Sequence, residues 1–197
     1  LQRYALENLV RILILVLAIL PLQAYSYPKV DTIENSYTVE ANDKGSLLSA
    51  INNASPIRES GEVFHAHTDT YVNWNYWWDK RNNYCKLNRV ETTVTITYTL
   101  PRLSSKTKNV EVKRIWNIYY SALIEHEEGH GQIAIDAAQL IERSLRDLPS
   151  YSNCDLLSKK ANAKAQRILN KFSQKHFDYD NKTNHGKTQG AYLNLYL

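Results

Sequence analysis

Residues 115–140 read IWNIYYSALIEHEEGHGQIAIDAAQL, and one set of positions recurs every three or four residues along this stretch. The set comprises Ile115, Tyr119, Leu123, His126, His130, Ile133, Ala137 and Leu140. This period is that of one face of an α-helix. The pattern continues from about Val110 to Leu148, and Pro149 ends it. The sequence therefore predicts one long helix on which two histidines replace apolar residues of the core-facing side.

Within this helix, residues 126–130 are His-Glu-Glu-Gly-His, an H-E-x-x-H motif. Residues four apart on a helix share a face and lie about 6 Å apart along the axis, so both imidazoles can reach one ion. Zinc binds neutral imidazole nitrogens, and a catalytic zinc site has three protein ligands and one position for water. Glu127 is placed to take a proton from that water. The motif thus predicts a zinc site with His126 and His130 as ligands and Glu127 as general base.

The motif leaves the third ligand open. Asp136 follows His126 by ten residues, but on an unbroken helix it is rotated about 240° from His130 and lies about 9 Å further along. We therefore expect Asp136 to face solvent. A better candidate segment is 179–191, YDNKTNHGKTQGA, which carries Asp180, Thr183 and His185 among turn-forming residues. Composition alone favours an exposed histidine in a polar loop as the interpretation of His185, whereas the presence of the zinc motif favours a ligand.

With these two segments the chain resembles a bacterial family, domain of unknown function 922, whose members are described as secreted zinc-dependent proteases. That family combines an H-E-x-G-H helix with a late T-x-H-G and Q-G-A segment, matched here by residues 183–186 and 189–191. The resemblance covers nearly all of the chain after residue 30. It implies His126 and His130 as zinc ligands, Glu127 as general base and His185 as the third ligand, oriented by Asp180 or Thr183.

The other histidines have simpler interpretations. Strand alternation places His65 and His67 on one face with Asp69, where they could bind a metal, but a solvated strand face is the better prediction. His176 lies near the expected end of a second helix, from about Cys154 to Lys175, and would interact favourably with the helix dipole there.

The N-terminus has the layout of a secretory signal peptide. Arg3 and Arg11 precede the apolar run 12–22, and Ala24 offers a cleavage site. We predict a signal peptide at residues 1–24 and a single domain at 25–197, in a secreted or periplasmic protein. An uncleaved membrane anchor is the alternative, and we expect no other contact with a membrane.

The composition limits the expected partners and predicts the oxidation state of the cysteines. The chain has 24 basic and 20 acidic residues, a net charge of +4, and no concentrated basic stripe, so nucleic acid is not an expected partner. Its two cysteines, Cys85 and Cys154, are predicted to form a disulfide in an oxidising compartment. Zinc ligation by these cysteines is disfavoured, because no C-x-x-C spacing is present.

The remaining patterns predict an α+β fold. Residues 36–41 are expected to form a strand and 45–54 a short helix, while 64–78 and 87–100 alternate and should form an antiparallel pair. Strands early and helices late predict an antiparallel sheet packed against the zinc-binding helix and the second helix.

Together these features predict a secreted zinc metallopeptidase, a monomer acting on a peptide or protein substrate that could belong to the cell envelope. One alternative is an envelope binding or assembly module in which the metal is structural or absent. Another is a zinc amidase or endopeptidase that cleaves peptidoglycan.

Overall fold

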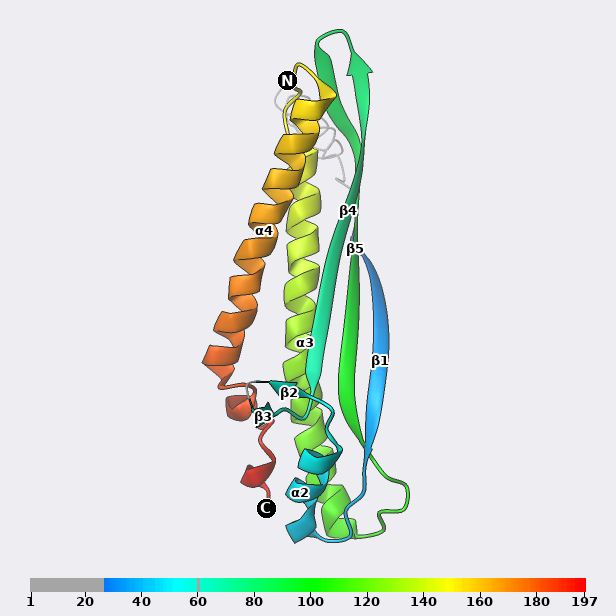
Figure 1. The fold of residues 1–197 in the computed structure, drawn as a ribbon, viewed down its shortest axis with the longest axis vertical. Coiled ribbons are helices and arrows are strands. Elements are labelled where there is room, and N and C mark those ends of the chain that lie inside the picture. The colour runs from blue at the N-terminus through cyan, green and yellow to red at the C-terminus, as the bar shows by residue number, and fades with distance from the viewer. Residues whose placement is uncertain (1–26, 60) are drawn as a thin grey trace, which may run out of the picture.

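The computed structural model describes residues 27–59 and 61–197. The predicted signal peptide, residues 1–24, lies outside the described residues. The molecule is elongated: two long helices and a long hairpin run side by side along its longest axis (Figure 1).

A three-stranded sheet forms one layer. Strands β4 (His67–Arg81) and β5 (Tyr84–Leu103) form an antiparallel hairpin, which confirms the predicted pair. Strand β1 (Lys29–Val39) pairs with the other edge of β5, giving the order β1-β5-β4. Because β1 runs parallel to β5, the sheet is mixed rather than wholly antiparallel. The long connection from β1 to β4, which includes a helix, permits the parallel pairing.

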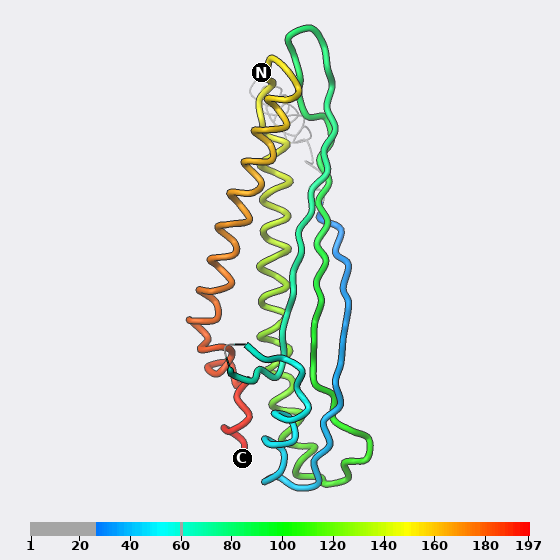
Figure 2. Tube along the Cα trace, in the orientation of Figure 1, coloured from blue at the N-terminus to red at the C-terminus, as the bar shows by residue number. Residues whose placement is uncertain are grey.

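Short elements occupy that connection and the C-terminus. Helix α2 (Lys44–Ala54) follows β1, as predicted, and a small hairpin of β2 (Arg58–Glu59) and β3 (Glu62–Val63) precedes β4. After the last long helix come two short 3-10 helices, η1 (Lys187–Gln189) and η2 (Leu193–Leu195). The tube in Figure 2 shows that this C-terminal segment continues downward from the end of the last long helix and lies beside the lower half of the other long helix.

The two long helices form the second layer. Helix α3 (Val110–Arg146) begins at the capping residue Asn109, and helix α4 (Cys154–Thr183) begins at the capping residue Asn153. The structure confirms the predicted α+β fold and both helices. Helix α4, however, continues eight residues beyond Lys175, so that residues 179–183 are helical.

Small side chains bring the layers close together. On α3, Ala134, Ala137 and Ala138 are buried in one cluster with Val94 and Ile96 of β5. Helix α4 adds Ala161 and Ala165 to the same cluster. Because alanine adds little bulk, the helix backbones can approach each other and the sheet closely. The small side chains at these positions therefore allow α3 to pack against both α4 and β5.

A disulfide joins Cys85, at the start of β5, to Cys154, the first residue of α4, as predicted from the sequence. Cys85 also exchanges two backbone hydrogen bonds of 2.8 Å with Tyr151. These links fix the hairpin to the N-terminal end of α4. A disulfide fits an extracytoplasmic protein. Among the described residues, no helix is long and apolar enough to cross a membrane.

Candidate metal centre

Three side chains from α3 and α4 converge at one point. His126 and His130 lie one helical turn apart on α3, and Asp180 faces them from the last turns of α4. The Oδ1 atom of Asp180 lies 3.3 Å from Nε2 of His126 and 3.0 Å from Nε2 of His130. One donor atom from each residue lies within 4.8 Å of the other two, so the group could hold a metal ion.

The donor set fits zinc in kind and in spacing. Two imidazole nitrogens and one carboxylate oxygen are common zinc ligands, with bonds of about 2.0–2.2 Å. In a tetrahedral site such bonds place neighbouring donor atoms about 3.3–3.5 Å apart. The two observed separations, 3.0 and 3.3 Å, are close to this value. All three donor atoms lie within 4.8 Å of one another, so one ion could reach them together.

The carboxyl group of Asp180 is held ionised at this point. Burial alone would raise its pKa, but hydrogen bonds from His126 and His130 outweigh that effect and hold the pKa well below its usual range. An ionised carboxylate is the form that binds a cation. Asp180 therefore brings a negative charge to the two imidazole groups.

His126 is held from three sides. Its Nδ1 atom lies 3.0 Å from Oε1 of Gln189, an acceptor that keeps Nδ1 protonated, so that loss of the Nε2 proton now shared with Asp180 would leave Nε2 to bind a metal. The ring of Tyr179 stacks on the imidazole at 5.1 Å between centroids, and its hydroxyl donates to the His126 carbonyl at 3.3 Å. Gly186 also passes so close that a β-carbon there would lie 2.9 Å from Cγ of His126. The C-terminal segment thus fixes the orientation of this ring.

His130 is oriented by another histidine. Its Nδ1 atom lies 3.0 Å from Nδ1 of His176 on α4. The ring centroids are 5.3 Å apart and the planes differ by 16°, so the rings lie almost edge to edge in one plane. One proton must lie between the two nitrogens. If His130 donates it to His176, Nε2 of His130 is free to bind a metal.

Glu127 turns toward the sheet rather than toward α4. Its side chain is buried, and its Oε2 atom accepts a hydrogen bond of 2.5 Å from the hydroxyl of Thr68 on β4. The same hydroxyl lies 3.2 Å from the Glu127 carbonyl. Thr68 therefore fixes the Glu127 carboxylate in place. Burial lowers the pKa of His126, but hydrogen bonds to Asp180 and Gln189, followed by the nearby charge of Glu127, raise that pKa above its ordinary value.

Comparison with known protein families gives one match. The family model described as "Bacterial protein of unknown function (DUF922)" matches residues 34–186. The chain belongs to this family. No curated protein and no solved structure matches the chain. The matched DUF922 region contains Glu127 and all three residues of the metal group, and it ends just before Gln189.

In this DUF922 protein, the structure does not bring His185 to the metal group. His185 follows the C-cap of α4 and has a φ of 51°. Its side chain is exposed, and its ring centroid lies 6.0 Å from that of Phe64. Its backbone N–H donates to the Asp180 carbonyl at 2.8 Å. Asp180 was predicted only as a residue that orients His185, but it supplies the third donor itself, because α4 extends far enough to carry it.

The other predicted residues fall outside the group. Thr183 is buried and its hydroxyl accepts from Gly186 N at 3.2 Å, so it shapes the turn after α4. Asp136 is exposed, as predicted. His67 is exposed beside Asp69, but His65 is not on a solvated face: its ring nitrogens lie 2.6 Å from the Tyr119 hydroxyl and 2.7 Å from Oδ1 of Asn52. His176 contacts His130 through its Nδ1 atom, rather than interacting with the dipole at a helix end as predicted.

Two residues of the site were not predicted from the sequence. Thr68 and Gln189 contact the motif side chains from a distant strand and from the C-terminal segment. The segment 189–191 was noted for the resemblance, but nothing in one sequence shows which side chain a histidine will bond. For α4 the sequence does contain one relevant pattern. His176 and Asp180 are four residues apart, the same spacing as His126 and His130, so on a helix they would share a face.

Proposed function

We propose that this chain is an exported zinc-dependent hydrolase that cleaves peptide bonds. The observation that carries the proposal is the convergence of His126, His130 and Asp180 beside the buried carboxylate of Glu127. Within the described residues the metal group has three members, and three protein ligands leave one tetrahedral position open, as in catalytic rather than structural zinc sites.

Each residue then has a stated task. Zinc bound there would supply a Lewis acid that lowers the pKa of a water molecule and polarises a carbonyl group. Glu127 accepts the proton of the attacking water and passes it to the leaving amine. Thr68 holds the carboxylate in place for both transfers. His176 and Gln189 keep the two ligand rings oriented through their Nδ1 atoms.

The sheet supports a peptide as substrate. Strand β4, which carries Thr68, is an edge strand in the order β1-β5-β4. The unpaired backbone groups of an edge strand can bind an extended peptide by strand addition. Export is supported by the disulfide, by the signal-peptide layout of residues 1–24, and by the resemblance to secreted proteases.

Glu127→Gln tests the proposal, with Glu128→Gln as the matched control, since Glu128 is the exposed neighbour on the same helix. We expect about one zinc per chain in all three proteins. Hydrolysis of an unfolded protein substrate should fall by a factor of at least about 100 in Glu127→Gln only. Zinc binding without turnover would instead favour a binding module, and turnover of peptidoglycan alone would favour the amidase.

A further inference from the structure

The metal centre lies at one end of a surface that both β4 and α4 border. Near the start of β4, Thr68 bonds to Glu127 beside the metal group. Further along the same strand, the indole N–H of Trp74 donates to Asn162 of α4 at 3.0 Å. Asn162 and Asp180 are eighteen residues apart, about five full helical turns, so they share one side of α4. That side therefore faces β4 from the Trp74 contact to the metal centre.

This side of α4 carries no charged residue between its two ends. Six residues lie within about 60° of the line from Asn162 to Asp180, and none is acidic, lysine or arginine: Ala165, Gln166, Leu169, Ser173, His176 and Phe177. The charged residues of the same span all lie about 140° or more from that line: Lys164, Arg167, Lys171, Lys175 and Asp178. The charges of α4 are thus confined to the side away from β4.

Burial does not explain this distribution. Gln166, Ser173 and Phe177 are exposed, and Phe177 is 62% exposed. These three residues and the partly buried Leu169 form the α4 strip. The solvent-facing side of a helix ordinarily carries its charged residues, yet this exposed strip has none although lysines are frequent elsewhere on α4. Such a surface is suited to an uncharged partner.

Strand β4 borders the same surface with an unpaired edge. Its side chains that point toward the helices, Thr68, Thr70, Val72 and Trp74, are also uncharged. In the order β1-β5-β4 the outer backbone groups of β4 have no neighbouring strand. From Thr68 to Trp74 the strand rises roughly 20 Å, the length of about six extended residues. A peptide paired with this edge directs alternate side chains toward α4.

Phe177 is the member of the α4 strip nearest to the metal group. It precedes Asp180 by three residues, a spacing that makes the two side chains neighbours on the helix surface. An apolar side chain bound beside Asp180 would cover the exposed ring.

We propose that the α4 strip and the edge of β4 bind about six residues of an extended peptide with uncharged side chains, on one side of the bond that is cleaved. Phe177 contacts the side chain nearest that bond and favours an apolar one. A charged side chain on the strip would leave water without an opposite charge to pair with, which is unfavourable. This inference rests on the proposed function, because the metal centre defines where the cleaved bond lies.

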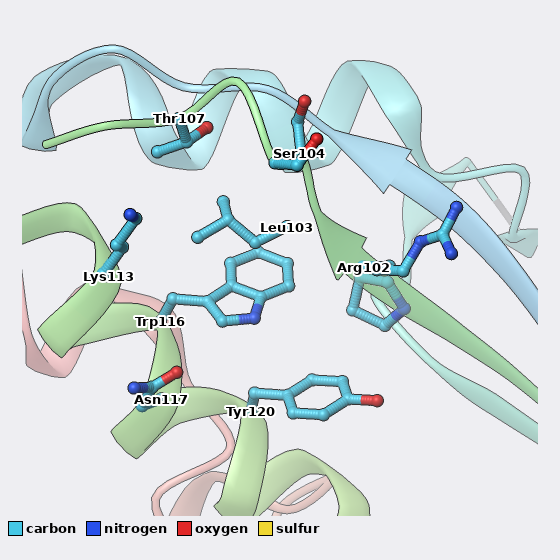
Figure 3. A pocket seen from close by; sticks show the side chains of 10 residues that line it. Arg102, Leu103, Ser104, Thr107, Lys113, Trp116, Asn117 and Tyr120 are labelled. Atoms are coloured by element: carbon cyan, nitrogen blue, oxygen red, sulfur yellow. The ribbon is translucent and has the colours of Figure 1, made fainter.

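A cavity elsewhere in the molecule supplies a control position. It has a volume of about 440 Å³ and lies by the first turns of α3, where Figure 3 shows Asn117 beside Trp116. The pairs His126–Asp180 and His130–His176 show that α4 runs antiparallel to α3, so the α4 strip extends from the metal centre toward the C-terminal end of α3. Trp116 lies about 15 Å from His126 in the opposite direction. A peptide on the α4 strip therefore does not contact Asn117.

The test measures binding separately from hydrolysis. It uses the full disulfide-bonded chain carrying Glu127→Gln, with zinc added, so that the probe is not cleaved. The probe is a fluorescently labelled octapeptide of alanine, leucine and threonine with both ends blocked, and a second probe carries glutamate in place of two leucines. Fluorescence anisotropy gives the Kd of each. We expect saturable binding of the uncharged probe and at least about 10-fold weaker binding of the glutamate probe.

Three lysine substitutions locate the peptide. Ser173→Lys places a charge within the α4 strip, Gln174→Lys places it about 100° round the same helix, and Asn117→Lys places it in the remote cavity. Ser173→Lys should weaken binding of the uncharged probe by at least about 5-fold and tighten binding of the glutamate probe. The other two substitutions should change either Kd less than about 2-fold.

The outcomes separate this inference from the hydrolase proposal. Equal affinity for the two probes, an equal effect of Ser173→Lys and Gln174→Lys, or weaker binding only in Asn117→Lys would overturn the inference. If the natural chain hydrolyses protein and Ser173→Lys alters neither binding nor KM, the hydrolase stands and the α4 strip is not its binding surface. If Ser173→Lys alone weakens binding and the natural chain hydrolyses nothing, the strip stands as a peptide-binding surface and the hydrolase does not.

Discussion

The hydroxyl group of Tyr179 lies so close to the backbone of Gly129 that a β-carbon at residue 129 would clash with it. Glycine in mid-helix costs about 1 kcal/mol relative to alanine. The close approach explains why glycine is present despite this cost. The ring of Tyr179 must reach over α3 to stack on His126, and only glycine leaves room for it. The second glycine of the motif region is similar: a β-carbon at Gly131 would overlap the hydroxyl of Tyr98 on β5.

Gly129→Ala should therefore destabilise the protein although alanine favours helices. Displacing Tyr179 should cost about 1–3 kcal/mol in the free energy of unfolding and should also weaken zinc binding, since the ring that holds His126 moves. Urea unfolding measures the first effect. In a Tyr179→Leu background the same substitution should cost little or should stabilise. An equal cost in both backgrounds would show that Tyr179 is not the reason for the glycine.

The third metal ligand separates the structure from the sequence-based prediction. Asp180→Ala removes the carboxylate that lies 3.0 and 3.3 Å from the two histidines. It should lower zinc affinity by a factor of more than about 100, whereas His185→Ala should change it less than about 3-fold. Competition with a chromophoric chelator measures both. The reverse order would return the role to His185.

The His130–His176 contact predicts an effect without direct metal contact. His176→Phe removes the hydrogen-bond partner of His130 Nδ1 and should weaken zinc binding by about 10–100-fold. His176→Asn restores an acceptor oxygen and should recover part of the loss. The d–d spectrum of the cobalt-substituted protein should keep its shape in both variants. A changed spectrum in His176→Asn would show instead that residue 176 binds the metal.

The Cys85–Cys154 disulfide joins the β4–β5 hairpin covalently to α4. Replacing both Cys85 and Cys154 by serine opens a loop with a sequence separation of 69 residues and should lower the free energy of unfolding by up to about 4 kcal/mol. Zinc affinity should stay within about 3-fold, because Asp180 lies at the opposite end of α4 from Cys154, and His126 and His130 of α3 lie beside that far end. Denaturant unfolding and chelator competition on the same samples check both statements.

Much of the fold could be predicted because its signals are local. The period of α3, the alternation of β4 and β5, and the two cysteines each appear in short windows of sequence. The parallel pairing of β1 could not be predicted, since strand direction depends on the path of the connection rather than on the residues of the strand.

The residues of the metal site also include some that a local motif predicts and one, Asp180, that it does not. His126, Glu127 and His130 lie within five residues, so one motif brings them to notice. Asp180 was assigned to a turn because residues 179–184 are rich in Asp, Asn and Thr, which have low helix propensity. In the protein residues 179–183 continue α4, because packing against α3 outweighs local propensity, and that extension carries Asp180 to the metal group.

His65 makes the stability of the protein depend on pH. Burial lowers its pKa from the ordinary 6.5 to about 4, and its ring bonds to Tyr119 and Asn52. Between these two pH values the unfolded chain binds a proton at His65 and the folded chain does not, so the stabilising effect is complete above about pH 6.5 and is lost as the pH falls toward 4. The loss should approach about 3 kcal/mol at its largest. Urea unfolding at pH 7 and pH 4.5 should show a smaller difference in His65→Gln than in the natural chain, whereas the exposed control His67→Gln should match the natural chain. If His65→Gln lost as much stability as the natural chain over this range, other titrating groups would have to account for the acid sensitivity.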